Sequence, residues 1–143
     1  VILMHMQGTP RTMQQLPRYH DVVGDVAAFL LAAAARAERA GIARGRILLD
    51  PGIGFGKTVR HNLALMGALR QFVSLGFPVV VGPSRKSFIG RTLDAPEVDG
   101  RLAGTLACVA QAYASGVHVV RVHDVREASQ AIRMLEAMAH AGR

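Results

Sequence analysis

The chain has little cysteine and few aromatic residues, which argues against a disulfide-stabilised protein and against a nucleic-acid-binding protein. Cys108 is the one cysteine among 143 residues, so an internal disulfide is excluded. We expect Cys108 to be a buried structural thiol on a helix. Aromatic residues make up only 5% of the chain, and the net charge of +7 comes mostly from scattered arginines with no long basic run. These features argue against a nucleic-acid-binding surface.

Long apolar segments are also missing. The longest apolar stretch, residues 27–35, is too short to span a bilayer and ends at Arg36. The chain opens on a strand-like segment with no basic region before it, which does not fit a signal peptide. We therefore expect a soluble, cytoplasmic protein with no membrane partner. Half of the residues are hydrophobic, which is enough for a substantial core in one domain of this length.

Four apolar segments each precede a loop and a segment of helical periodicity, which indicates four βα units. The predicted strands are residues 1–6, 46–50, 78–82 and 118–122. The predicted helices are residues 25–40, 62–75, 99–115 and 126–141, followed by glycines typical of helix ends at positions 41, 76, 116 and 142. Strands this uniformly apolar favour a parallel sheet covered by helices.

These four units fill the chain, whereas a complete (β/α)8 barrel needs about 250 residues. The predicted fold is α/β, with residues 1–143 forming one partial domain that amounts to half of a (β/α)8 TIM barrel. The chain also opens inside a predicted strand, as if cut from a longer protein. Unpaired strand edges would make this segment self-associate or fold poorly on its own.

The loop after the second predicted strand is the most informative motif. It reads Asp-Pro-Gly-Ile-Gly-Phe-Gly-Lys-Thr over residues 50–58, and it places a carboxylate and flexible glycines at the carboxyl end of a strand. A nucleotide-binding P-loop would need glycine at position 51, where this chain has Pro51. The G-x-G-x-G spacing also fails to match the dinucleotide fingerprint G-x-G-x-x-G. The loop is therefore expected to serve another ligand.

The other three predicted strands also end in polar motifs. These are Leu-Met-His-Met-Gln-Gly-Thr-Pro at residues 3–10, Gly-Pro-Ser-Arg-Lys-Ser-Phe-Ile-Gly at residues 82–90, and Arg-Val-His-Asp-Val at residues 121–125. Because barrel strands end at one face, we expect the polar side chains of these ends to share one cavity. The residues concerned are Asp50, Lys86, Arg121 and His123. Arg121 and His123 alternate along a predicted strand, so both should leave the same face, where they could hold an anion.

Taken together, the four motifs resemble the second half of dihydropteroate synthase, a folate-pathway enzyme with a (β/α)8 fold. The resemblance covers essentially the whole chain and implies the C-terminal half of the barrel. It implies the joining of 4-aminobenzoate to 6-hydroxymethyl-7,8-dihydropterin diphosphate, with release of diphosphate. Magnesium would be bound through the absent N-terminal half and the substrate diphosphate, so this fragment holds no metal ligand and is not expected to turn over alone.

The resemblance also assigns roles to individual residues. Asp50 would accept hydrogen bonds from the exocyclic amine and ring N–H of the pterin, and Lys86 would donate to its carbonyl and ring nitrogen. Arg121 and His123 would hold the diphosphate and complete the catalytic group. Further pterin contacts are implied for Met4, Phe55, Gly82 and Arg121. The aminobenzoate site is implied to consist of Phe55, Ser87 and Lys86.

A homodimer of the full-length protein is also implied, formed through its last helices. An apolar stripe in the last predicted helix could serve there or simply pack in the core, and core packing is the simpler interpretation. The stripe consists of Ala128, Ile132, Leu135 and Ala139.

Simpler structural explanations remain for several of these residues. Asp50 before Pro-Gly could form a turn, Met4 could be core, and Asp124 could cap the last helix while His123 only packs. His5 lies between two methionines without the further ligands of a catalytic metal site, so no metal site is predicted within the chain.

Other functions also remain open. One is a non-catalytic half-barrel that binds a pterin, another is the pterin-binding domain of a corrinoid methyltransferase, and a phosphate-binding sugar barrel rests on fold alone. The motifs at residues 84–87 and 121–123 favour the synthase over the methyltransferase, because methyl transfer from a folate leaves no diphosphate to hold.

Overall fold

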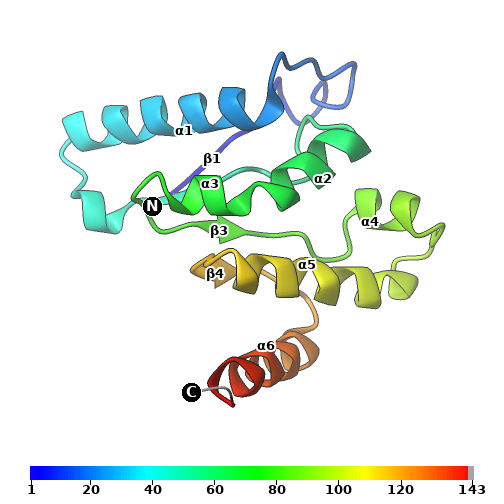
Figure 1. Ribbon diagram of the computed structural model, residues 1–143. Coiled ribbons are helices and arrows are strands. Elements are labelled where there is room, and N and C mark those ends of the chain that lie inside the picture. Colours follow the sequence, from blue (N-terminus) through cyan, green and yellow to red (C-terminus); the bar gives the residue numbers. More distant parts are fainter. Residues whose placement is uncertain (142–143) are drawn as a thin grey trace.

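Four short parallel strands lie side by side, in chain order, within residues 1–141, which are the residues that the computed structural model describes (Figure 1). They are β1 (Ile2–Met4), β2 (Leu48–Asp50), β3 (Val80–Val81) and β4 (Val119–Val120). β1 pairs with β2, β3 pairs with β4, and a parallel bridge between Leu49 and Val79 joins the two pairs. The predicted parallel arrangement is confirmed, although each strand is shorter than its predicted range.

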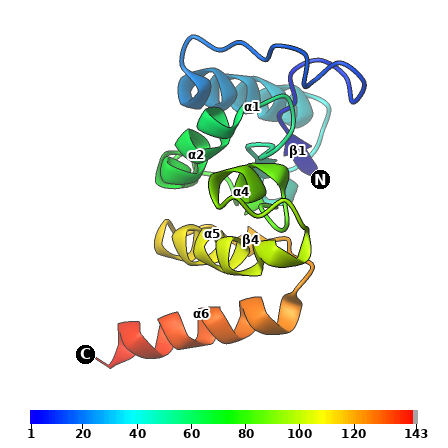
Figure 2. The same cartoon turned by 90° about the vertical axis from the view of Figure 1, so that its right-hand side faces the viewer.

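Helices follow each strand, so that the chain makes four successive βα units. They are α1 (Val22–Arg39) after β1, α2 (Val59–Gly67) and α3 (Leu69–Val73) after β2, α4 (Ser87–Thr92) and α5 (Leu102–Ala114) after β3, and α6 (Val125–His140) after β4. Short 3-10 turns at Arg44–Arg46 and Asp99–Arg101 precede β2 and α5. In Figure 2, α1, α2, α5 and α6 follow one another from top to bottom.

Helix boundaries differ from the prediction at identifiable places. α1 begins earlier than position 25, because the Asp21 carboxylate accepts the Val23 N–H at 3.1 Å and caps it. The single helix predicted over residues 62–75 is wrong, since the helix breaks at Ala68 (φ −98°, ψ 12°) between α2 and α3. α4 was not predicted. The glycines at 41, 76 and 116 have positive φ as expected of helix ends, and Gly142 lies outside the described residues.

The core lies between the central strands and the helices. Its fully buried members include Leu49 of β2, Val81 of β3, Leu30 of α1 and Phe72 of α3. Burial on both faces was predicted for all four strands and is wrong for the outer two. Ile2 of β1 is 58% exposed and Val119 of β4 is 44% exposed, because each outer strand has a neighbour on one side only.

The C-terminal part of the chain is less buried. In the apolar stripe of α6, Ala128 is buried, Ile132 and Leu135 are half-buried, and Ala139 is exposed. Cys108 is half-buried rather than fully buried, and burial raises the pKa of its thiol to about 11. Within residues 1–141, no helix combines the length and apolarity needed to cross a membrane.

Candidate functional site

Two of the predicted site residues lie next to each other where β1 and β2 end. Met4 pairs with Asp50 in the parallel register, so both side chains leave the same face of the sheet. The next residue, His5, donates its backbone N–H to the Asp50 carbonyl at 3.0 Å, while its ring meets Phe29 of α1 at 4.9 Å between centroids. Met4 and Asp50 therefore face away from α1.

Asp50 orders the glycine loop that follows it. Its Oδ1 accepts the Gly52 N–H at 2.7 Å, so the turn role considered for this residue is present in the structure. Burial raises the pKa of the Asp50 carboxyl, whereas the Gly52 N–H and the positive charges of Lys86, Arg121 and Lys57 lower it. Burial outweighs these opposing effects, so the pKa of Asp50 lies above its usual value.

Lys86 reaches back over the same loop. Its Nζ donates to the carbonyl of Ile53 and lies 4.1 Å from the centroid of the Phe55 ring. Burial lowers the pKa of Lys86 to about 8, opposed by the charge of Asp50. Gly54 has φ 84°, and a Cβ there would lie 2.6 Å from Cδ of Lys86. Glycine at position 54 therefore leaves the space that the lysine stem occupies.

A hollow of about 170 Å³ brings together the ends of β3 and β4. It is lined by Gly82, Ser84, Lys86, Arg121, Val122 and His123. Three of the four side chains predicted to share one cavity are therefore together, while Asp50 is outside this lining because its carboxyl turns to the N–H of its own loop. β4 ends before Arg121, so the predicted strand alternation is wrong, although Arg121 and His123 still line the same hollow.

Ser84 fixes one wall of this hollow. Its Oγ accepts the backbone N–H of His123 at 3.2 Å and lies 2.9 Å from the ring Nδ1 of His123. Arg121 lies over Gly82, where an added Cβ would stand 3.3 Å from the arginine Nε. The imidazole and the guanidinium thus line the same hollow, with hydrogen-bond donors available to an anion.

An ion pair joins the two loops behind this hollow. Arg85, which adopts φ 58°, donates from Nε and Nη2 to the two carboxylate oxygens of Asp124 at 3.1 and 2.5 Å. This bidentate pairing lowers the pKa of Asp124. Asp124 is the N-cap residue of α6, as the alternative interpretation has it, but its carboxylate pairs with Arg85 and makes no capping hydrogen bond to the helix.

The residues assigned to aminobenzoate lie on two sides of Lys86. Phe55 is under the Lys86 ammonium, whereas Ser87 is exposed at the first position of α4. Ser87 lines a second hollow, of about 220 Å³, together with Gln14, Gly54, Lys57, Val59, Asn62, Phe88 and Arg91. The predicted roles of Phe55 and Ser87 in binding aminobenzoate remain predictions.

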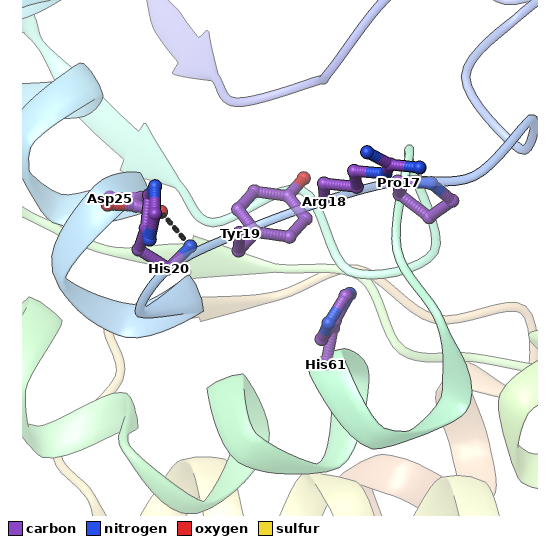
Figure 3. A pocket seen from close by; sticks show the side chains of 6 residues that line it. All are labelled: Pro17, Arg18, Tyr19, His20, Asp25 and His61. Carbon is purple, nitrogen blue, oxygen red and sulfur yellow. Dashed lines mark hydrogen bonds between the residues drawn. The ribbon is translucent and has the colours of Figure 1, made fainter.

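Sequence reasoning missed a residue that braces this loop from the α1 side. Tyr19 donates its hydroxyl to the Gly56 carbonyl at 2.7 Å and packs edge to face on His61, 4.9 Å between centroids. Figure 3 shows these two rings facing each other in an open hollow of about 620 Å³. Burial raises the pKa of Tyr19 to about 12, so its hydroxyl remains a donor at neutral pH. Because Tyr19 and the loop are far apart in the sequence, no local pattern predicted this contact.

Comparison with known proteins places this geometry in a family. The family of pterin binding enzymes matches residues 1–123, which include all four strand ends. The chain belongs to the pterin-binding enzyme family. In this family match, α6 is the one helix of the described residues that lies beyond the matched range.

Three relatives illustrate this membership, and each is a dihydropteroate synthase. Dihydropteroate synthase of Escherichia coli (strain K12) is 48% identical over 137 residues, covering 96% of this chain and 48% of that protein. The Thermus thermophilus synthase in complex with 6HMPPP superposes with a TM-score of 0.91 at 45% identity, over 96% of this chain and 55% of that one. The Xanthomonas albilineans synthase in complex with 7,8-dihydropteroate gives a TM-score of 0.90 at 37% identity, over 97% and 50%. The chain spans about half the length of the relatives it matches.

Proposed function

We propose that residues 1–143 supply the C-terminal half, four βα units, of a (β/α)8 barrel that acts as a dihydropteroate synthase. The reaction joins 4-aminobenzoate to 6-hydroxymethyl-7,8-dihydropterin diphosphate and releases diphosphate. The coverage of about half of each relative supports this division. So do the outer strands β1 and β4, whose exposed edges another four βα units would pair.

One observation carries the proposal: the half-buried carboxylate of Asp50 lies near a hollow lined by two cations and an imidazole. Asp50 can accept two hydrogen bonds from the amine and ring N–H of a pterin, and Lys86 can donate to the pterin carbonyl once it leaves the Ile53 carbonyl. Arg121 and His123 then face the substituent that carries the diphosphate. The positive charges of Lys86 and Arg121 fit a ligand that carries an anionic group such as a diphosphate.

The chemistry follows from these positions. The bond between the pterin methylene carbon and the diphosphate oxygen breaks, and its electron pair leaves with the diphosphate. Donors from Arg121 and His123 stabilise the departing negative charge. The cation left on the methylene is delocalised into the pterin ring, and the Asp50 carboxylate offsets the charge that develops there. The aminobenzoate nitrogen then forms the new C–N bond and gives up a proton.

The second substrate is proposed to lie against Phe55, with its carboxylate bonded by the Ser87 hydroxyl or backbone N–H. Met4 and Gly82 complete the pterin side. Holding the amine near the methylene carbon makes the second step effectively intramolecular, which lowers its barrier by reducing the entropy that must be lost.

Magnesium does not fit the residues of this chain. The wall of the hollow offers hydrogen-bond donors, and no group of three or more His, Cys, Asp or Glu side chains within residues 1–141 could hold a metal ion. We therefore assign any magnesium to the diphosphate and the other half of the barrel. Exposed methionines on α6, Met134 and Met138, support the further proposal that the full-length protein is a homodimer through this helix.

The experiment begins with the coding DNA upstream of Val1, read for about 110 to 130 further in-frame residues, the complement of a complete barrel. The full-length protein should form dihydropteroate from the two substrates, and the 143-residue chain alone should form none. A full-length protein that binds the dihydropterin diphosphate without forming product would contradict the synthase proposal. A start codon at Val1 would instead favour a half-barrel that only binds.

A further inference from the structure

Lys57 carries a buried ammonium group that the chemistry described above does not use. The residue is only 4% exposed. Its Nζ donates to the carbonyl of Phe55 at 2.9 Å and lies 3.0 Å from Nδ1 of His5. A charge this deeply buried costs free energy unless it is paired and hydrogen-bonded. Its partners therefore indicate what it contributes.

The first partner, His5, meets the ammonium as a neutral ring. Burial and the positive charge of Lys57 lower the pKa of His5 to about 4, so at neutral pH Nδ1 is free to accept a hydrogen bond. The ring lies against Phe29 and Tyr19, with centroids 4.9 and 5.9 Å away. His5 thus holds the Lys57 ammonium from the α1 side of the loop.

The second partner is the loop itself. By holding the Phe55 carbonyl, Lys57 fixes the peptide on which the aromatic wall of the site stands. The neutral side chain of Asn62, which is 2% exposed, also braces this loop. It accepts the Gly54 N–H at 2.6 Å and donates to the Thr58 carbonyl at 2.8 Å. Both residues brace one loop, but only Lys57 adds a charge.

That charge lies close to the Asp50 carboxylate: the Lys57 Nζ is 3.4 Å from where a Cβ would stand on Gly52, whose N–H is accepted by Asp50 Oδ1. Burial raises the pKa of Asp50, and Lys86, Arg121 and Lys57 each lower it. Burial lowers the pKa of Lys57 to about 8, while Asp50 raises it and Lys86 lowers it further. The other titratable group near Lys57 is His61 of α2, whose pKa is lowered by burial, by Lys57 and by its neighbour on the same helix.

We propose that Lys57 is a positioning residue of the pterin site: its two hydrogen bonds fix the Phe55 loop from the α1 side, and its positive charge stands beside the turn that Asp50 forms with Gly52. The role of Lys57 in turnover rests on the proposed function. The effect of its charge on the Asp50 carboxyl can be measured without any substrate.

The test uses three variants of the full-length protein. Lys57→Met removes the charge and the hydrogen bonds, Lys57→Arg keeps the charge, and Asn62→Leu removes a neutral brace of the same loop. Carboxyl ¹³C NMR titration of the ligand-free proteins gives the pKa of Asp50, and steady-state kinetics gives the KM for aminobenzoate.

In Lys57→Met, the pKa of Asp50 should move upward, because a cation beside the carboxylate is lost. Lys57→Arg should leave it near the wild-type value, and Asn62→Leu should not move it. The KM for aminobenzoate should rise about tenfold in both Lys57→Met and Asn62→Leu, because each loosens the loop that carries Phe55.

An unchanged Asp50 titration in folded Lys57→Met, or an equal shift in Asn62→Leu, would overturn the proposal. If Lys57→Met does not fold, Lys57→Gln keeps a donor without the charge and carries the same test. Failure of the wild-type protein to form dihydropteroate would count against the synthase function, whereas the NMR titration would still decide the role of Lys57.

Discussion

Replacing Asp50 with asparagine separates the loop-forming role of this residue from its proposed role in pterin binding. Asparagine keeps an oxygen at the position of Oδ1, which accepts the Gly52 N–H at 2.7 Å. The variant loses the negative charge and the second acceptor, and it turns an NH₂ donor toward the donors of the pterin. The loop should therefore keep its shape while ligand binding suffers.

The size of the effect follows from the bonds lost. A hydrogen bond to a charged group contributes about 1.5 to 3 kcal/mol, so the Kd for the dihydropterin diphosphate should rise about tenfold to a hundredfold. Isothermal titration of the full-length wild-type and Asp50→Asn proteins measures this directly. Asp94→Asn is the matched control, since Asp94 is exposed and its φ of 52° suits asparagine. A Kd for Asp50→Asn equal to that of the control would refute the assignment.

The same residue predicts a pH dependence. The pKa of Asp50 is raised by burial, so its carboxylate takes up a proton at a higher pH than an ordinary aspartate would. Pterin affinity should therefore be full above this raised pKa and fall as the pH drops through it. Titrations at a series of pH values should show this acid limb in the wild type and none in Asp50→Asn. An acid limb that persists in the variant would assign the titration to another group.

Two further variants test the loop and the strand behind it. Gly54→Ala should lower the steady-state rate strongly, because the added Cβ would press on Lys86. Gly41→Ala is the control: Gly41 has a similar positive φ, no atom lies within 4 Å of its Cβ position, and the rate should be unchanged. Equal rates in both variants would contradict this. For His5, the folded-state pKa of about 4 lies below 6.5, so the unfolded chain binds the proton first and the free energy of unfolding should fall as pH drops from 6.5 toward 4. Urea unfolding should show a smaller fall in His5→Asn, and identical slopes would refute it.

The order of strands and helices was readable from the sequence because it depends on local patterns. Apolar segments separated by helical periodicity predicted the four βα units, and glycines 41, 76 and 116 predicted helix ends that the structure confirms. α4 gave no comparable signal, since it has six residues and no side-chain cap. Local propensity also could not predict the break at Ala68, where the backbone leaves the helical region for one residue.

The sequence grouped three of the four expected residues around one hollow, but it did not predict the contacts that hold them. The rule that barrel strands end at one face correctly grouped Lys86, Arg121 and His123. The bonds that hold the surrounding loops join residues far apart in the chain: Arg85 with Asp124, and Lys57 with His5. Such pairs depend on the register of neighbouring strands and the path of each loop, which a single sequence does not specify.

The central claim is that this chain supplies the diphosphate-binding wall of a synthase, and affinity for the diphosphate tests it most directly. The full-length protein would be titrated with 6-hydroxymethyl-7,8-dihydropterin diphosphate and with the same pterin lacking the diphosphate, in the wild type and in Arg121→Met. The account predicts that the diphosphate compound binds at least about tenfold more tightly and that Arg121→Met removes most of this difference. Equal affinity for the two pterins in the wild type would contradict it.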